Sequence, residues 1–265
     1  MNVRDVQRYA DEASASFDRV DFVHAMTRDG LLLRLQPVVV EARTVVDLGT
    51  ATGSACHLLA RRFRGAHVIG VDVSRRMLAQ ARKKSGWFAR HSYVQADAEQ
   101  LPFPDHSVDV VFANLLLPWV GKPQSLFGEV ARVLRKDGVF AFSTLGPDSL
   151  LELRQAWQDL VAEPETGRFL DMHDLGDAAV RSGLRDPVLD VDRTAISYES
   201  TESLSRDLQA LGAPAALPAA LGKGWKAGPQ RFDLELVFGH CWGSGRFSGG
   251  GEYRLDPAQI QRRPG

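Results

Sequence analysis

The sequence predicts an α/β fold in which a doubly wound, mostly parallel sheet carries helices on both faces. Short, nearly continuous apolar runs alternate with segments in which apolar residues recur at helical spacing. These runs are too uniformly apolar for strands with one face in water, which favours strands buried on both sides. A glycine-rich turn follows the first run, and in such sheets ligands bind beyond the carboxyl ends of the strands.

The elements between residues 43 and 146 can be placed in order. Apolar runs predict strands at 44–48, 67–72, 92–97, 108–116 and 139–144. Helices are expected between them: one from Ala55 to Phe63, one after a Ser74 N-cap, and one over 123–135 that ends at Asp137-Gly138. Because crossovers between parallel strands are right-handed, this order gives a doubly wound sheet.

The pattern is looser after residue 146. We expect helices over 148–161, 173–182 and 202–211, strands over 188–198 and 232–240, and a loop or mobile cap over 213–228. The last two strands suit an antiparallel pair at the sheet edge, which makes seven strands in all. The expected organisation is an N-terminal helical cap over 1–42, the sheet with helical insertions over 43–242, and a flexible Gly-rich tail over 243–265.

Composition narrows the class of protein. The 265 residues are 44% hydrophobic and 25% charged, with a formal net charge of −1. Apolar runs stay well short of the roughly 18 residues of a membrane span, and the start of the chain does not resemble a signal peptide. Cys56 and Cys241 lack metal-ligand spacing. We therefore expect a cytoplasmic protein that binds neither membrane nor nucleic acid.

Charge is unevenly distributed along this nearly neutral chain. Residues 61–90 carry nine Lys and Arg against one Asp, and residues 148–207 carry fourteen acids against six Arg. Such an asymmetry could steer an anionic partner to one side of the molecule.

Polar and glycine residues gather where the predicted strands end. These candidate ligand-binding residues are Asp47, Gly49, Gly53, Asp72, Asp97 and Asn114. Positions 49, 51 and 54 are Gly, Ala and Ser, so the glycine pattern that binds a dinucleotide pyrophosphate is missing. Asp72 can accept both hydroxyls of a ribose, Asp97 an adenine amino group, and Asp47 an ammonium group directly or through water. A ligand with these parts and no phosphate is S-adenosylmethionine. We expect no metal cofactor.

Four segments then resemble the successive motifs of class I S-adenosylmethionine-dependent methyltransferases, a Rossmann-like family. They are VVDLGTATG, GVDVS, QADAEQLPFPDHSVDVVFANLLLPWV and EVARVLRKDGVFAFSTLG, and they cover about residues 43–146. The resemblance implies that Met77 and Leu115 flank the adenosyl group and that Ala98 adds to the cofactor site. It also marks one departure, Ala51, where the family usually has Gly.

The acceptor is not fixed by these motifs. The chain lacks the Asn-Pro-Pro-Tyr and Pro-Cys sequences of amine and cytosine methylation, and residues 114–119 offer no obvious general base. A carboxylate acceptor has a pKa near 4 and is already a nucleophile at neutral pH. Such a displacement needs alignment and exclusion of water, so we predict no catalytic acid or base.

A second, narrower resemblance covers the region after the fifth strand. The segments FSTLGPDSLLELR, DMHDLGD, RDLQALGA and FGHCW are similar to those of malonyl-acyl-carrier-protein O-methyltransferases of biotin synthesis. The resemblance implies esterification of the free malonyl carboxyl on an acyl carrier protein, or CoA, thioester. We expect the enzyme to be a monomer. The acceptor-side candidates are Tyr9, Phe17, Arg154 and His173, with Arg154 on the carboxylate. Phe17 stands where the family usually has Tyr.

Two other functions stay open at this point. One is a methyltransferase for a quinone or another small acceptor, and the other is a methyltransferase-like arginine hydroxylase or assembly factor of respiratory complex I, which residues 146–154 also resemble. An acidic carrier would need a basic docking face, for which the candidates are Lys223, Lys226 and Arg231, or Arg75, Arg76 and Arg82.

Overall fold

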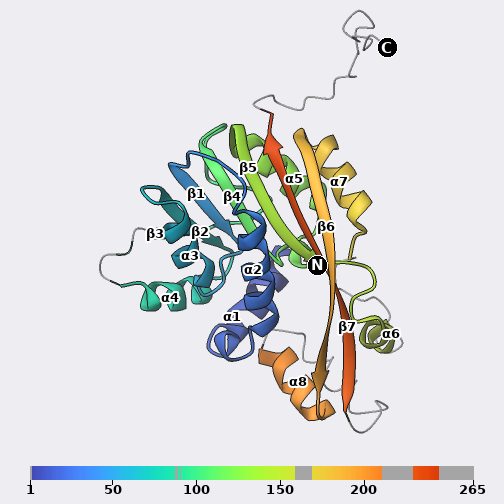
Figure 1. The fold of residues 1–265 in the computed structure, drawn as a ribbon. Helices are drawn as coiled ribbons and strands as arrows, with labels where there is room; N and C mark the ends of the chain where they lie inside the picture. Colours follow the sequence, from blue (N-terminus) through green and yellow to red (C-terminus); the bar gives the residue numbers. More distant parts are fainter. Residues whose placement is uncertain (1, 87–88, 90, 159–168, 211–228, 245–265) are drawn as a thin grey trace, which may run out of the picture.

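The computed structural model of the chain describes residues 2–86, 89, 91–158, 169–210 and 229–244. Seven strands form one sheet (Figure 1). They are β1 (Thr44–Leu48), β2 (His67–Asp72), β3 (His91–Gln95), β4 (Val108–Asn114), β5 (Leu134–Leu145), β6 (Leu184–Tyr198) and β7 (Gln230–Gly243). Their order is β3-β2-β1-β4-β5-β7-β6. The first five are parallel, and β7 pairs antiparallel with both β5 and β6, which confirms the predicted fold class.

Helices cover both faces of the sheet (Figure 1). The described helices are α1 (Val3–Ala13), α2 (Phe22–Arg34), α3 (Ser54–Arg62), α4 (Arg75–Lys84), α5 (Pro123–Val133), α6 (Leu151–Gln158), α7 (Met172–Arg181) and α8 (Thr201–Ala210), with short 3-10 turns η1 (Phe17–Arg19) and η2 (Leu117–Trp119). Buried side chains of α2 and α3 share one core cluster with the sheet, and those of α5 and α7 share the other. In β1, Val45 faces the first cluster and Val46 the second, so neighbouring residues of this strand are both buried.

Several predicted strand boundaries were wrong: β3 ends at Gln95 and not at 97, β5 starts at Leu134 and not at 139, and β6 starts at Leu184 and not at 188. Two further boundaries were wrong for local backbone reasons. Strand β4 ends at Asn114 and not at 116, because Leu115 has a φ of +53° and the chain then turns through η2. The helix expected over 123–135 ends at Val133, and Asp137-Gly138 lies within β5 instead of ending the helix. Asp137 has a φ of +62°, and a Cβ on Gly138 would lie 3.0 Å from the Asp109 carbonyl oxygen.

Strands β6 and β7 continue as a two-stranded ribbon beyond the end of β5. β5 pairs with β7 only up to Leu236, whereas β6 and β7 stay paired as far as Tyr198 and Gln230. A separate small cluster, which contains Leu153 of α6 and Leu204 of α8, packs against this ribbon. Figure 1 shows α8 at the ribbon and close to α1. The ribbon of β6 and β7 thus places α8 close to the N-terminal helix α1.

Candidate active site

A pocket opens where the strand order reverses, between β1 and β4, at the carboxyl ends of the strands. Its lining comes from the ends of β1, β2 and β4, from the loops after β3 and β4, and from α1, η1 and α2. The predicted residues in this lining are Gly49, Asp72, Met77, Asp97, Ala98, Asn114, Leu115 and Phe17. The structure therefore brings together residues that are up to 98 positions apart in the chain.

The glycine-rich turn after β1 forms one wall of the pocket. Gly49, Ala51 and Gly53 have φ values of +74°, +47° and +80°. The N–H groups of Gly49 and Thr50 both donate to the Val71 carbonyl, which fixes the turn on β2. A Cβ on Gly49 would lie 2.9 Å from Leu116, whereas a Cβ on Gly53 would lie 2.6 Å from the Tyr93 hydroxyl. Gly53 therefore allows close packing behind the turn and does not line the pocket.

Asp72, at the end of β2, presents a carboxylate to the pocket. One of its oxygens accepts from the Ser74 N–H at 2.8 Å and the other from the Ala51 N–H at 2.9 Å. Burial raises the pKa of this carboxyl group to about 6. Each carboxylate oxygen has room for a further hydrogen bond, so Asp72 can accept from two neighbouring hydroxyls of a ligand. A ribose fits this requirement.

Asp47 lies underneath the turn and not in the pocket lining. It is buried, and one carboxylate oxygen accepts from the Thr50 hydroxyl at 2.5 Å and from the Cys56 thiol at 3.3 Å. Burial raises its pKa to about 6. This geometry gives Asp47 a role in holding the turn, and its predicted contact with a ligand ammonium would have to run through water.

Asp97 and Asn114 line the pocket from two further strand ends. A carboxylate oxygen of Asp97 accepts from the Glu99 N–H at 2.9 Å, which shapes the loop after β3. The Asn114 amide accepts from the Ser143 hydroxyl at 2.8 Å and donates to the His24 carbonyl at 2.9 Å. Asn114 thus connects the sheet to α2, a contact that its predicted cofactor role did not include.

The N-terminal helices cover the pocket. Phe17 is buried and lines it, whereas Tyr9 lies outside the lining, beside the Arg8 guanidinium. Two carboxylates hold this region on the sheet domain: Asp11 accepts from the Ser74 hydroxyl at 2.5 Å, and Asp18 from the Thr52 hydroxyl at 2.5 Å. These contacts hold α1 and η1 over the pocket, whereas Leu31 of α2 is buried in a core cluster with the sheet. That residues 1–42 as a whole form a cap stays a prediction.

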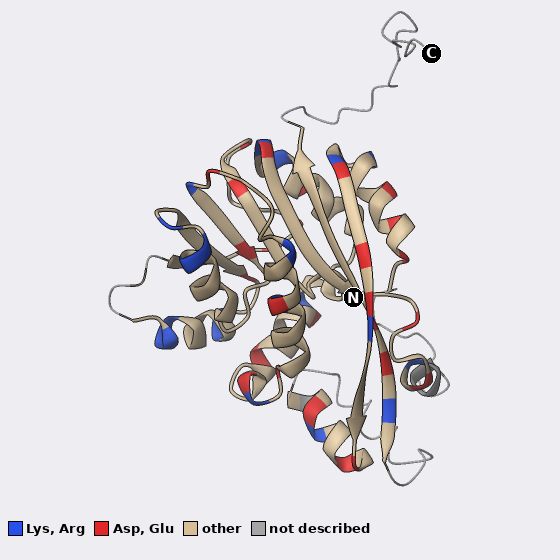
Figure 2. Cartoon of the chain, viewed as in Figure 1, with Lys and Arg blue, Asp and Glu red and all other residues tan. Residues whose placement is uncertain are grey.

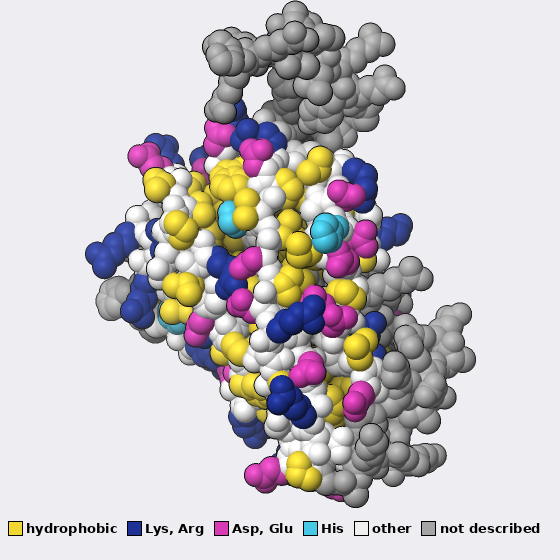
Figure 3. Space-filling model, turned by 45° about the vertical axis from the view of Figure 1, so that its right-hand side comes forward, with side chains coloured by type: hydrophobic (Ala, Val, Ile, Leu, Met, Phe, Trp, Pro, Cys, Tyr) yellow, Lys and Arg dark blue, Asp and Glu magenta, His cyan; other side chains and the backbone are white. Residues whose placement is uncertain are grey.

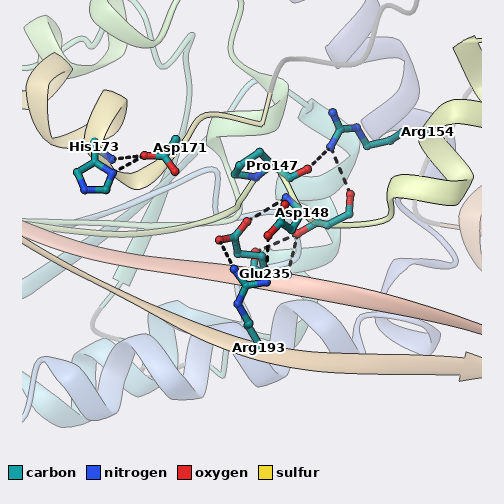
Figure 4. A network of polar contacts seen from close by, with 8 residues as sticks. Pro147, Asp148, Arg154, Asp171, His173, Arg193 and Glu235 are labelled. Atoms are coloured by element: carbon teal, nitrogen blue, oxygen red, sulfur yellow. Dashed lines mark hydrogen bonds and ion pairs between the residues drawn. The ribbon is translucent and has the colours of Figure 1, made fainter.

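Arg154 and His173, two predicted acceptor-side residues, do not line the pocket. Figure 4 shows both with their hydrogen-bond partners. The Arg154 guanidinium donates to the carbonyls of Pro147 at 2.8 Å and Ser149 at 3.4 Å. The His173 side chain is 82% exposed and bonds to the Asp171 carboxylate at 2.6 Å. In the described structure both residues therefore organise their own segments.

The pocket also contains residues that the sequence analysis did not name as site residues, among them Glu99, Trp119 and His24. His24, on α2, lines the pocket, and its only sequence signal is a single histidine on an N-terminal helix. No motif links it to Asn114, which is 90 positions away and holds its carbonyl.

The described residues contain no group of three or more His, Cys, Asp or Glu arranged to hold a metal ion. None of the described helices is long and apolar enough to cross a membrane. Of the basic docking candidates, Lys223 and Lys226 lie outside the described residues, as do the whole predicted loop over 213–228 and residues 245–265 of the predicted tail.

Comparison with known proteins extends these observations to the whole chain. Residues 46–142 match the model of a methyltransferase domain. The chain is 38% identical to the malonyl-[acyl-carrier protein] O-methyltransferase of Halorhodospira halophila, over 98% of this chain and 96% of that relative. It is 36% identical to the same-named protein of Laribacter hongkongensis, over 88% and 86%.

Solved structures support the fold. The YcgJ protein from Bacillus subtilis superposes with a TM-score of 0.60 at 19% identity and covers 81% of this chain and 98% of its own. A phosphoethanolamine N-methyltransferase of Haemonchus contortus, solved in complex with S-adenosyl-L-methionine, gives a TM-score of 0.55 at 19% identity, over 82% of this chain and 52% of its own. By the sequence relatives and the methyltransferase fold together, this chain belongs to the malonyl-[acyl-carrier protein] O-methyltransferase family.

Proposed function

We propose that this protein transfers a methyl group from S-adenosylmethionine to the free carboxyl of a malonyl thioester carried by acyl carrier protein. The observation that carries the proposal is the 38% identity to a malonyl-[acyl-carrier protein] O-methyltransferase along nearly the whole of both chains. The similarity includes the late helices and strands, where methyltransferases of one fold differ in their acceptors. The quinone-methyltransferase and arginine-hydroxylase alternatives have no comparable support.

The pocket suits the cosubstrate at its β2 and β3 end. Asp72 would accept both ribose hydroxyls, and Asp97 the adenine amino group, with Met77, Ala98 and Leu115 beside the adenosyl group. The turn at Gly49 lets the ligand approach backbone without a Cβ between them. Asp47 would support that turn from below. These assignments keep the predicted cofactor site, with Asp47 and Gly53 acting behind the pocket wall.

The methyl transfer requires little from the protein beyond alignment of the two substrates. When bound, the cosubstrate supplies a methyl group on a sulfonium, which a carboxylate oxygen can take in one displacement. The new C–O bond forms as the C–S bond breaks, sulfur keeps the electron pair, and no proton moves. The chain's part is to orient the carboxylate and to exclude water, and the cap residue Phe17 would close the pocket for this purpose. The product ester is uncharged, which would suit chain elongation toward the pimeloyl unit of biotin.

Of the other acceptor-side candidates, Arg154 keeps unused donors but lies outside the pocket lining. Its Nη1 atom is used by the loop carbonyls, while Nε and Nη2 have no hydrogen bond to the described residues. His173 and Tyr9 would act only if the acceptor extends beyond the described pocket. An acceptor bound to a carrier protein extends from the malonyl group to the carrier, so contacts outside the pocket are compatible with the proposal.

The carrier would dock on the face of α3 and α4. Figure 2 shows Lys and Arg gathered on these helices, and Arg75 and Arg76 start α4 next to the pocket residue Met77. The face in Figure 3 carries acidic and basic side chains interspersed. On β6, Asp190 is already ion-paired with Arg34 of α2. An acidic carrier is therefore steered to α3 and α4 and not to β6.

The direct test is incubation of the protein with methyl-labelled S-adenosylmethionine and malonyl-carrier protein. We expect label on the malonyl group as a base-labile methyl ester. Label on a quinone or another small acceptor in a parallel reaction, with none on malonyl, would overturn the proposal. Binding of the cosubstrate without transfer to any acceptor would favour an assembly factor instead.

Salt dependence tests the docking face. Raising ionic strength from about 0.05 to 0.5 M should slow methylation of malonyl-carrier protein more than that of malonyl-CoA, because only the former uses a long-range protein surface. The double variant Arg75→Gln, Arg76→Gln should lose most of this difference, whereas Arg181→Gln on α7 should keep it. Equal salt curves for carrier and CoA would exclude electrostatic docking.

A further inference from the structure

We infer that His24 donates the hydrogen bond that holds the free carboxyl of the acceptor in the pocket. The inference rests on the proposed function and adds to it a substrate-positioning residue from α2. It is carried by the position of the imidazole in the pocket lining and by a ring nitrogen that lacks a partner.

The His24 ring is set into the wall of the pocket. Its Nδ1 atom is inaccessible to water and makes no hydrogen bond with the described residues. The ring packs edge-to-face on Phe17, with centroids 5.0 Å apart. Nε2 also makes no hydrogen bond with the described residues and, unlike Nδ1, is not closed to solvent. It is therefore the ring nitrogen that can donate to a ligand in the pocket.

The backbone of His24 is fixed by the strand end that opens the pocket. Its carbonyl accepts from the Asn114 amide at 2.9 Å and from the Thr27 hydroxyl at 3.2 Å. Asn114 is itself held by the Ser143 hydroxyl. These hydrogen bonds fix the position of α2 over the pocket, so the imidazole is in place before any ligand binds.

The charges of the pocket direct a carboxylate to this place. The described lining contains three acids and neither Lys nor Arg. The acids, Asp72, Asp97 and Glu99, follow β2 and β3, where they would repel a second carboxylate. His24 contacts the end of β4 instead. Among the described lining residues, two side chains have N–H donors without a hydrogen bond to the described part of the chain. They are the His24 imidazole and the Trp119 indole.

A neutral imidazole suits the reaction. Burial lowers the pKa of His24 to about 4, so the ring is uncharged at neutral pH and donates from one nitrogen. It can hold one oxygen of the acceptor carboxylate and leave the other free to attack the methyl group. A permanent cation would bind more tightly and make the carboxylate a poorer nucleophile. His24 keeps its proton throughout, so it positions the acceptor without acting as an acid or base.

The test compares two variants of similar size. His24→Leu keeps the apolar packing on Phe17 but removes the donor, and His24→Gln restores a donor. We expect H24L to raise KM for malonyl-carrier protein at least tenfold, as for loss of a hydrogen bond to a charged group, with the Kd for S-adenosylmethionine within twofold of wild type. H24Q should recover most of that loss. H67L, at the far end of β2, serves as the matched control, and W119F tests the other donor.

The outcomes separate the inference from the proposed function. A wild-type protein that does not methylate malonyl-carrier protein overturns both. A wild type that does so, with H24L unchanged in KM, or with W119F showing the loss instead, overturns only the role of His24. Should the variants not fold, the ¹⁵N shifts of the His24 ring in wild type are measured as malonyl-CoA is added with S-adenosylhomocysteine present. A shift is expected, and none would overturn the inference.

Discussion

The two ends of the pocket are built in different ways. The cosubstrate end comes from the turn after β1 and from the ends of β2 and β3, so its residues follow one another in the order of the parallel strands. The acceptor end combines the cap, which precedes the sheet in the chain, with the end of β4. Its key contact, between Asn114 and His24, joins residues 90 positions apart.

This difference has a physical cause. Parallel strands bring their carboxyl ends to one edge, so a polar residue after an apolar run is placed by the fold itself. The acceptor end depends on how α1, η1 and α2 pack. The Ser74 and Thr52 hydroxyls donate to Asp11 of α1 and Asp18 of η1, and the Asn114 amide donates to the His24 carbonyl of α2. Substitutions should therefore separate into two groups, one affecting cosubstrate affinity and one affecting the acceptor.

The largest effect is expected at Asp72. Asp72→Asn removes one charged acceptor of the ribose hydroxyls and places an NH₂ group near an N–H of the turn. We expect the Kd for S-adenosylmethionine to rise about a hundredfold, since each hydrogen bond to a charged group contributes roughly 1.5–3 kcal/mol. Isothermal titration calorimetry measures it, with the exposed Asp177→Asn on α7 as the control. A change below threefold would show that the ribose lies elsewhere.

A second effect follows from the pKa of the same carboxyl group. Because burial raises the pKa of Asp72 to about 6, the free protein takes up a proton there as pH falls through 6. Protonation removes the charged acceptor, so affinity for S-adenosylmethionine should fall with pH, to about one tenth at pH 5 of its value at pH 7. The D72N variant should lose most of this dependence. A wild-type Kd independent of pH from 5 to 7 would contradict the assignment.

The fold, and the gathering of most predicted cofactor residues in one pocket, could be predicted from sequence, whereas the positions of Arg154 and His24 could not. Asp72, Asp97 and Asn114 each follow an apolar run, and this local pattern is enough to place them at the ends of strands. The predicted role of Arg154 relied on its residue type. The direction of its guanidinium is set by hydrogen bonds to the carbonyls of Pro147 and Ser149, which the sequence does not predict. His24 was missed because a single histidine acquires meaning only from the residues that folding places around it.

Arg154 tests whether the acceptor end extends past the pocket. Arg154→Ala removes a donor to two carbonyls and should destabilise the protein by about 1 kcal/mol. If Nη2 binds a part of the acceptor that lies outside the pocket, KM for malonyl-carrier protein should rise about fivefold, with the Kd for S-adenosylmethionine unchanged. Steady-state kinetics and thermal unfolding separate the two effects, with Arg193→Ala on β6 as a control. Equal changes for both substrates would exclude a role in binding the acceptor.

The smallest effect is expected at Ala51, where the two ends of the pocket meet. Its φ of +47° is costly for a residue with a Cβ, while its methyl group packs against the small cluster of Ala13, Phe17 and Met77 under the cap. Ala51→Gly removes the strain but loses that contact and adds freedom to the unfolded chain.

We expect these terms nearly to offset one another, with a net gain of about 0.5 kcal/mol in unfolding free energy and a Kd for S-adenosylmethionine within twofold of wild type. Chemical denaturation measures the first quantity and calorimetry the second. A loss of more than about 1 kcal/mol would mean that the methyl contact outweighs the backbone strain. The cosubstrate turn would then depend on the cap for its stability, and the division of the pocket into two separately built ends would no longer hold.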